Sequence, residues 1–207
     1  MTNNITLPPG EARAAGASVA DTLVTDRVAP PEPLLQSSYQ FLGDEDIPFS
    51  RYTSRAFAES ETERLWGRTW QWACREEHLQ EEGDSYVYDV GPYSVIVVRS
   101  APDRIQAFLN SCTHRGTRIL AGEGSAYSNG FTCPFHGWSW ELDGSIRHIP
   151  GRWDFPHVCN ERHALARVSC ERWGGFVFIN IDPDAAPLAQ YLDVLPDHFA
   201  HFPLEQR

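Results

Sequence analysis

The chain has 207 residues, of which 42% are hydrophobic and 12% aromatic, so it can bury the core of one domain and carry extensions. Its formal net charge of −11 and isoelectric point of about 5.1 argue against nucleic acid or an anionic membrane surface as a partner. Because no segment approaches the roughly 18 consecutive apolar residues of a membrane span, and the amino terminus has neither an apolar signal core nor a twin arginine, a cytoplasmic protein without a membrane partner is expected.

The amino-terminal residues 1–38 are rich in Ala, Gly, Pro and Thr, a composition that predicts a flexible tail. The alternative is an arm that docks on a neighbouring subunit. The tetrapeptide Ser60-Glu61-Thr62-Glu63 has the pattern of a capping box, which predicts a helix from there to about Gly67. Sequence typical of strands begins at Trp70.

The rest of the chain consists largely of short apolar or alternating segments separated by turn residues. Gly91-Pro92 predicts a hairpin, and Asp143-Gly144 predicts a second turn that leads into Ile146 and His148. The expected strands are residues 86–90, 93–98, 105–110, 131–133, 138–142 and 176–181. Many short strands with turn signals are typical of an all-β sandwich or barrel. A final short amphipathic helix is predicted from apolar residues at helical spacing, namely Leu188, Leu192, Leu195 and Phe199.

Two short segments combine cysteine and histidine at the spacing of metal ligands. The first is Cys112-Thr113-His114, and the second, after a gap of eighteen residues, is Cys133-Pro134-Phe135-His136. Two thiolates and two imidazoles suit either a tetrahedral zinc ion or a [2Fe-2S] cluster in which cysteine holds one iron and histidine the other. Gly116 and Gly137 follow the two pairs and permit tight loops. Five cysteines, an odd number with this spacing, favour a reducing compartment over a disulfide framework.

These loops resemble those of the amino-terminal Rieske half of the α-subunit of aromatic ring-hydroxylating oxygenases (Rieske non-haem iron oxygenases). The resemblance covers roughly residues 40–207 and also rests on the runs Cys133–Trp140, Trp173–Asn180 and Tyr191–Pro196. It implies a mainly β fold, a Rieske-type antiparallel β sandwich or barrel with an amino-terminal helix and a carboxyl-terminal linker helix. The implied domains are a flexible tail (1–38), a Rieske [2Fe-2S] domain (39–182) and a linker (183–207) toward a catalytic domain that the chain lacks.

Each of the four metal-ligand candidates has an expected role. Cys112 and Cys133 bind one iron as thiolates, and His114 and His136 bind the other through one imidazole nitrogen each. The resemblance implies that the outward nitrogen of one histidine meets an aspartate of the next subunit's catalytic domain. The implied cofactors are a Rieske-type [2Fe-2S] cluster here and a mononuclear Fe(II) only in the absent catalytic domain.

The resemblance likewise implies the partners of the chain. Electrons from NAD(P)H would arrive through a ferredoxin or reductase donor, and neighbouring α-subunits would assemble as a homotrimer or an α3β3 complex. The mononuclear iron would then insert oxygen into an aromatic ring. Alone, the chain is expected to accept and pass electrons but to oxidise no substrate.

Three positions distinguish the chain from respiratory Rieske proteins. Those proteins carry an extra cysteine in each loop, where this chain has Thr117 and Phe135, and a hydrogen-bonding serine where it has Trp138. Because hydrogen bonds and charge tune iron–sulfur potentials, a low potential near about −150 mV is expected. Within the oxygenases, Phe135 replaces a common tyrosine, and the long gap predicts an enlarged loop around residues 122–130.

Two other functions remain open for the same four residues: a free-standing Rieske ferredoxin-type electron carrier, and a zinc-binding structural module. A second set with ligand-like spacing is more simply a solvated loop: His157, Cys159 and His163. A third set has the residue types of a 2-His-1-carboxylate iron site, but in the wrong order for the family: Asp197, His198 and His201.

The remaining residues of chemical interest are interpreted as structural. This group comprises Cys74, His78 and Cys170, with Cys170 expected just before a strand. Trp138 and Trp140 are expected to shield the cluster or to pack in the β core. Arg115 and Arg118 either lend positive charge to the cluster or lie on a plain surface. A solvated acidic face is expected from Glu76, Glu77, Glu81, Glu82 and Asp84.

Overall fold

The computed structural model describes residues 17, 19–35, 45–122 and 124–206, in two compact units. The larger unit comprises Arg55–Tyr191 and Pro203–Arg207, and the smaller comprises Met1–Ser54 and Leu192–Phe202. All the strands of the described residues belong to the larger unit. The expected mainly β fold with few helices is confirmed.

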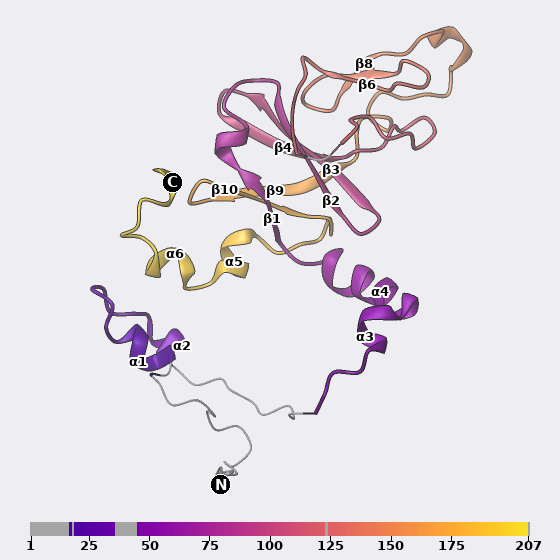
Figure 1. Cartoon of the computed structure of the whole chain (residues 1–207). Coiled ribbons are helices and arrows are strands. Elements are labelled where there is room, and N and C mark those ends of the chain that lie inside the picture. Colours follow the sequence, from indigo (N-terminus) through magenta and orange to yellow (C-terminus); the bar gives the residue numbers. More distant parts are fainter. Residues whose placement is uncertain (1–16, 18, 36–44, 123, 207) are drawn as a thin grey trace. The chain divides into compact units, whose positions relative to one another are not determined.

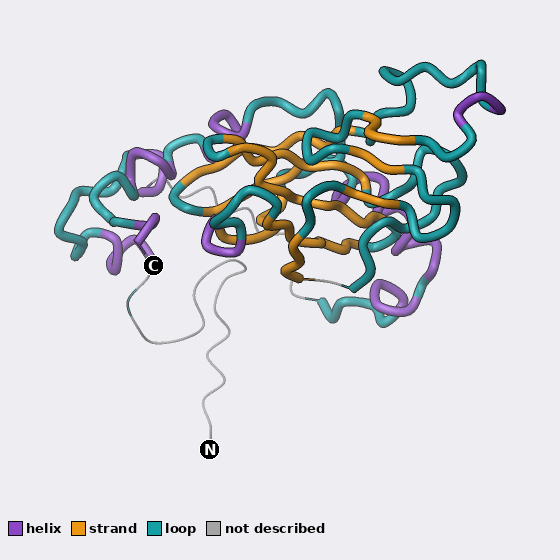
Figure 2. The backbone as a smooth tube through the Cα atoms, turned by 90° about the horizontal axis from the view of Figure 1, so that it is seen from above, coloured by secondary structure: helices purple, strands orange, loops and turns teal. Residues whose placement is uncertain are grey.

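The larger unit is built on a curled, seven-stranded antiparallel sheet with the strand order β1-β10-β9-β4-β3-β2-β5. Figure 1 shows a second sheet, with the order β6-β7-β8, at one end of this unit. Figure 2 shows the strands of the unit layered closely, with the loops gathered at their ends. The bounds are β1 Gln71–Arg75, β2 Asp84–Val90, β3 Tyr93–Ala101, β4 Arg104–Leu109, β5 Gly124–Tyr127, β6 Phe131–Thr132, β7 Ser139–Trp140, β8 Ile146–His148, β9 Arg167–Trp173 and β10 Phe176–Asn180.

The central strands carry a hydrophobic core on each face. In β3, Val95 and Val97 pack into one core, while Ile96 and Val98 pack into the other, and all four are fully buried. This explains the continuous apolar run, because side chains alternate between the two faces of a strand. The core around Ile96 also contains Cys112 and Cys133. The sheet therefore supports the two candidate loops directly.

The predicted hairpin and most of the predicted strands are confirmed. The strands β2 and β3 pair in antiparallel register, with Val87 opposite Ile96, around the turn at Gly91-Pro92. The third predicted strand is β4, which pairs with β3. The turn at Asp143-Gly144 joins β7 to β8 as expected. The strand predicted at residues 176–181 is β10, which lies between β1 and β9.

Two strands were not predicted. The strand β5 lies in the long gap between the candidate loops and pairs with β2, with Ala126 opposite Ser85. The loop predicted around residues 122–130 thus contains a strand of the large sheet. The strand β9 contains Cys170, so the expectation that this cysteine precedes a strand is wrong. Its mostly polar sequence hides it, although a local signal was present: the two-residue turn Gly174-Gly175 joins β9 to β10, with Trp173 opposite Phe176.

The predicted start of the amino-terminal helix is wrong, and its predicted end is confirmed. The helix α4 begins at Arg55 and ends at Glu61, and a π-helical turn, η1, continues it over Thr62–Trp66. The apparent capping box therefore lies inside the helical segment. Within it, the hydroxyl of Thr62 donates to the carbonyl of Ala58 at 2.8 Å, four residues back, as is usual in a helix interior.

The carboxyl-terminal part forms two short helices where one was predicted. These are α5 (Leu188–Leu192) and α6 (Leu195–His198). Between them Asp193 has a φ of +50°, in the left-handed region, which interrupts the helix. Further on, the 3₁₀ turn η4 (Leu204–Gln206) is tied to the large sheet, because Arg75 Nη2 donates to the carbonyl of Leu204 at 2.9 Å.

The described residues of the smaller unit are helical or irregular. Its helices are α1 Val19–Leu23, α2 Glu32–Leu35, α3 Ser50–Thr53 and α6. A flexible tail is predicted for residues 1–38, and of these, residues 1–16, 18 and 36–38 lie outside the described residues. Across the described parts of both units, no helix has the length and apolar character needed to cross a membrane.

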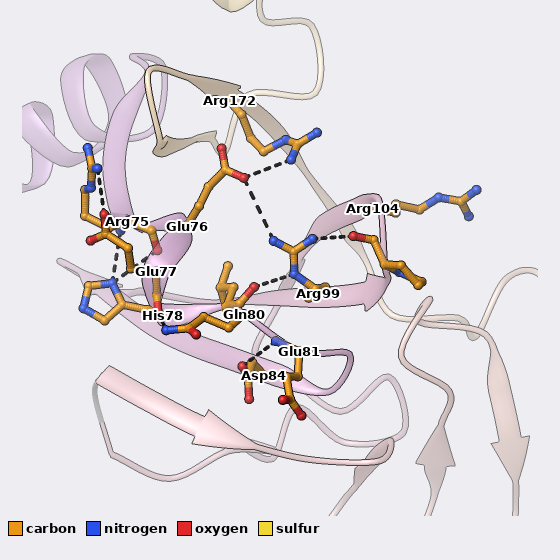
Figure 3. Close-up of polar contacts among 12 residues, drawn as sticks. Arg75, Glu76, Glu77, His78, Gln80, Glu81, Asp84, Arg99, Arg104 and Arg172 are labelled. Atoms are coloured by element: carbon orange, nitrogen blue, oxygen red, sulfur yellow. Dashed lines mark hydrogen bonds and ion pairs between the residues drawn. The ribbon is translucent and has the colours of Figure 1, made fainter. Parts of the chain in front are cut away.

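The predicted acidic face is partly wrong, because Glu76 belongs to an ion-pair network (Figure 3). Its carboxylate Oε2 lies 3.0 Å from Nη1 of Arg172 and 4.0 Å from Nη2 of Arg99. Arg99 also donates through Nε to the carbonyl of Leu79 and through Nη1 to that of Pro102. Glu76 begins the 3₁₀ turn η2 (Glu76–His78), so the network ties this turn to β3 and β9.

Removing Arg99 is expected to cost more stability than removing its neighbour Arg172. The side chain of Arg99 is only 11% exposed, and its loss leaves the carbonyl of the fully buried Leu79 without that donor. We expect Arg99→Ala to lower the free energy of unfolding by about 2 kcal/mol. Arg172→Ala loses an exposed ion pair and should cost less than about 1 kcal/mol. Urea unfolding followed by tryptophan fluorescence measures both, and equal losses would contradict the prediction.

Candidate metal centre

The first candidate loop, residues 110–120, follows β4 and is closed by one buried side chain. The Oδ1 atom of Asn110 accepts hydrogen bonds from the backbone N–H groups of Ile119 and Leu120, at 3.0 and 2.9 Å. Its Nδ2 atom donates to the carbonyl of Leu120 at 2.9 Å and to Oγ of Ser94 at 3.0 Å. Asn110 is only 4% exposed. It therefore fixes the base of the loop that presents Cys112 and His114.

The two candidate loops share one backbone pattern. In the first, Cys112 N donates to Thr117 O at 2.8 Å, and Gly116 N donates to Cys112 O at 2.8 Å. In the second, the same two bonds run from Cys133 N to Trp138 O at 2.8 Å and from Gly137 N to Cys133 O at 3.1 Å. Both glycines have φ values in the left-handed region, +74° and +71°. The predicted tight loops are thus present, in equivalent form.

The two cysteine side chains meet inside the protein. Cys112 and Cys133 are 3% and 2% exposed, and their thiols are hydrogen-bonded to each other. Burial raises the pKa of Cys112. Burial acts in the same direction on Cys133, but backbone N–H groups of His136 and Phe135 donate to its sulfur, so the pKa of Cys133 lies below its ordinary value. Hydrogen bonds of this kind stabilise a thiolate, which is the form that binds a metal.

The two histidine rings also meet, but in different surroundings. Their centroids lie 4.9 Å apart. His114 is half-buried and His136 is exposed. Burial, followed by the charges of His136 and Arg115, holds the pKa of His114 below its usual value. The Nδ1 atom of His114 is buried and has no hydrogen-bond partner in the described structure. A buried imidazole nitrogen without a partner is costly unless a ligand uses it.

This donor set fits the [2Fe-2S] cluster that the resemblance implies. Two thiols form one pair and two imidazoles form another, as expected where cysteine holds one iron and histidine the other. The unpartnered Nδ1 of His114 supplies a nitrogen of the required kind. Among the residues that the structure describes, no three His, Cys, Asp or Glu side chains gather as they would around a single metal ion.

A third segment, residues 149–165, packs against the two loops. Oγ1 of Thr113 and Nε1 of Trp140 both donate to the carbonyl of His163, at 2.8 and 3.0 Å. Phe155 lies edge-on to the ring of His114, with centroids 5.8 Å apart. Val158 joins the same hydrophobic core as Cys112 and Cys133. The segment thus covers the loops from outside.

The two arginines near the loops have different surroundings, and so do the two tryptophans. The guanidinium of Arg115 is exposed, and its charge helps to lower the pKa of His114, so it lies beside the centre. Arg118 instead contacts Asp89 at 2.8 Å and the carbonyl of Gly122. Trp138 stacks on His114, with centroids 4.7 Å apart, whereas Trp140 is fully buried in the core.

The two other sets of residues with ligand-like spacing do not form metal sites in the described structure. The thiol of Cys159 donates to Oε2 of Glu161 at 2.6 Å, and Nδ1 of His163 lies 2.9 Å from the carbonyl of Cys159. His157 is exposed. The set Asp197, His198 and His201 belongs to the smaller unit. Neither set forms a group of metal ligands in the part of the chain that the structure describes.

Sequence reasoning missed Asn110 and Phe155. Asn110 is a polar residue at the end of an apolar strand, two positions before Cys112, and that position was its one available signal. Phe155 lies 41 residues after His114 in the sequence, and no local pattern connects the two.

The comparisons with known proteins agree with this site. Residues 69–158 match the Rieske [2Fe-2S] domain family, and such a domain binds a [2Fe-2S] cluster. The chain is 33% identical over 146 residues to the carnitine monooxygenase oxygenase subunit of Escherichia coli K12, which covers 70% of the chain and 39% of that subunit. It is 35% identical over 142 residues to the biphenyl 2,3-dioxygenase α-subunit of Rhodococcus jostii RHA1, which covers 68% of the chain and 31% of that subunit.

Solved structures show the same similarity. A crystal structure of a quaternary ammonium Rieske monooxygenase matches with a TM-score of 0.67 and 28% identity, over 74% of this chain and 43% of that one. Naphthalene 1,2-dioxygenase matches with a TM-score of 0.63 and 27% identity, over 69% of this chain and 32% of that one. The chain thus spans well under half the length of these relatives. It belongs to the proteins that carry a Rieske [2Fe-2S] domain, and its homologues are the α-subunits of Rieske oxygenases.

Proposed function

We propose that this chain is the electron-transfer part of a Rieske non-haem iron oxygenase α-subunit. In this proposal Cys112 and Cys133 bind one iron of a [2Fe-2S] cluster, and His114 and His136 bind the other. The observation that carries it is the arrangement of the side chains as a buried thiol pair beside an imidazole pair, with the Nδ1 atom of His114 unpartnered. When bound, such a cluster supplies a centre that takes up and releases one electron.

The protein groups around the site have distinct tasks. Backbone N–H groups at the two cysteines stabilise the thiolate charges. Trp138 and Phe155 exclude water from His114. His136 remains exposed, and besides His114 its ring contacts Phe135, which is itself 62% exposed. We therefore assign the outward-facing nitrogen that meets an acceptor group to His136.

The proposal for the whole protein extends this role. A ferredoxin or a reductase would donate electrons derived from NAD(P)H, and a mononuclear non-haem iron in a neighbouring α-subunit's catalytic domain would receive them. Two kinds of relative support an oxygenase: dioxygenases named for biphenyl and naphthalene, and monooxygenases named for carnitine. The structure of a quaternary ammonium Rieske monooxygenase gives insight into electron transfer between its subunits. We propose an assembly of several α-subunits, as a homotrimer or α3β3 complex, in the cytoplasm, acting on an aromatic ring.

Electron paramagnetic resonance of the dithionite-reduced, anaerobically purified protein tests the cluster. We expect a rhombic spectrum with the low average g value of a mixed cysteine and histidine cluster. His136→Cys is expected to keep a cluster but to lower its reduction potential, because a thiolate adds negative charge to the iron that the imidazole held. A silent spectrum with stoichiometric zinc would overturn the proposal in favour of a structural zinc site.

A further inference from the structure

The side chain of Trp138 packs against one face of the His114 ring. The indole and imidazole planes differ by only 3°, and their centroids lie 4.7 Å apart. Phe155 closes a second side, edge-on to His114 at 5.8 Å and to Trp138 at 5.6 Å. Trp138 is only 2% exposed, so the packed core holds the indole in place. A parallel stack of this kind resists rotation of the imidazole about its Cβ–Cγ bond.

Trp138 connects the two candidate loops. Its backbone carbonyl accepts the bond from Cys133 N that closes the second loop, while its side chain covers a histidine of the first loop. The residue next in the chain, Ser139, begins β7 and pairs with Thr132 of β6. A change at this indole therefore reaches His114 without removing any ligand.

The second histidine has no equivalent cover. His136 is exposed, and its closest ring neighbours are His114 and the largely exposed Phe135. The two imidazoles thus differ in their access to water, although the two loops have the same backbone bonds. The aromatic residues, rather than the loop backbone, create this difference.

We infer that Trp138 is a positioning residue for electron transfer: its indole fixes the ring plane of His114 and keeps water from it, which lowers the reduction potential of the centre. This rests on the proposed function, since it takes the two histidines as iron ligands. Water around an iron–sulfur centre favours the reduced state, because that state carries one more negative charge. Packing that keeps water from His114 therefore favours the oxidised state, which lowers the reduction potential.

The test compares Trp138→Leu and Trp138→Phe with Trp140→Phe in the full chain. Trp140→Phe is the matched control, because this fully buried tryptophan lies in β7, two residues after Trp138, and has no ring contact with His114 among the described residues. It loses the hydrogen bond from its Nε1 to the carbonyl of His163, so it also reports what a loss of packing near the loops does by itself. Iron content and visible absorption establish that each variant is loaded. The readouts are the reduction potential, the width of the EPR lines, and the ¹⁴N couplings of the two histidines in pulsed EPR.

We expect Trp138→Leu to broaden the EPR lines and the nitrogen coupling of one histidine, because its ring samples more orientations. The equilibrium constant for reduction should rise at least tenfold, or about 59 mV for one electron. Trp138→Phe, with a smaller aromatic face, should lie between Trp138→Leu and the natural protein. If the Trp138→Leu variant does not bind a cluster, the comparison of Trp138→Phe with Trp140→Phe decides the test.

Three outcomes are distinguishable. If the line widths, nitrogen couplings and reduction potentials of the Trp138 variants equal those of Trp140→Phe, the inference is overturned. The cluster itself remains established in that case. A shift confined to the Trp138 variants would support the inference. Absence of a mixed-ligand cluster in the natural protein would instead contradict the proposed function, before any variant is compared.

Discussion

Cys133→Ala is expected to abolish the cluster, leaving a protein without the rhombic EPR signal and without stoichiometric iron. The thiol of Cys133 is 2% exposed, is hydrogen-bonded to that of Cys112, and has a lowered pKa. An alanine methyl group cannot coordinate iron. Because metal binding is coupled to folding, the thermal midpoint should fall as well.

The matched control is Cys74→Ala. Cys74 is 3% exposed but lies in the opposite core, on β1. Burial, and to a smaller extent the charges of Cys170 and Glu76, raise the pKa of Cys74 to about 12, so its thiol stays protonated at neutral pH. We expect this variant to keep the EPR signal and its iron. A normal signal in Cys133→Ala, or its loss in Cys74→Ala, would show that the ligands are assigned wrongly.

The ligand candidates could be predicted from the sequence because their signal is local. Each pair of cysteine and histidine occupies three or four consecutive residues, and a tight loop places both side chains on one side. The following glycines adopt the left-handed backbone that such loops require. The same reasoning succeeded for the hairpin at Gly91-Pro92, where a turn joins two adjacent strands.

The parts that escaped prediction depend on contacts between distant segments. The strand β9 pairs on one side with β4, where Ala107 lies opposite Val168, sixty-one residues later, although its hairpin with β10 is local. The contact of Phe155 with His114 likewise joins separate segments. The helix start was misread because Ser60–Glu63 satisfies a capping pattern while lying within a helical segment that begins earlier. A sequence window holds no information about the long-range partners, β4 for β9 and Phe155 for His114.

The pairing of charged residues in the acidic segment also depends on contacts between distant segments. Five acidic residues between positions 76 and 84 indicate a solvated face. The partners of Glu76 come from β3 and β9, so its pairing depends on the sheet order. Asp84, by contrast, is satisfied locally, because its Oδ2 atom accepts from the backbone N–H of Glu81 at 2.8 Å.

The side chain of Asn110 gives the second large expected effect. Asn110→Ala should lower the free energy of unfolding by about 3 kcal/mol, since it removes four hydrogen bonds and leaves the N–H groups of Ile119 and Leu120 without their acceptor. The loop that presents Cys112 and His114 then loses its base. The EPR lines of the cluster should broaden, and cluster loading should fall.

The control is Asn180→Ala, at the end of β10 and away from the candidate loops. Asn180 is 2% exposed and likewise uses both ends of its amide, donating to the carbonyl of Arg68 at 3.2 Å and accepting from Asp182 N at 3.0 Å. We expect this variant to lose stability but to keep the EPR line widths of the natural protein. Broadening of the same size in both variants would mean that general destabilisation, and not the base of the loop, controls the cluster.

The substitution Asn110→Asp distinguishes the contribution of the amide oxygen of Asn110 from that of its NH₂ group. The substitution keeps the shape and the acceptor for Ile119 and Leu120, but replaces the donor to Ser94 and Leu120 O with a second oxygen. We expect the new carboxyl group to have a pKa above its value in the unfolded chain. Burial disfavours the charged form, and only the protonated form can donate to the carbonyl of Leu120, which together outweigh the two N–H groups that favour the charged form. Stability should therefore be highest below the ordinary pKa of an aspartate, fall as pH rises from there through the raised pKa of the folded state, and stay low above it. Denaturant midpoints measured from pH 4 to pH 8, relative to the natural protein, would show this decline, and a flat difference would contradict the burial of the loop's base.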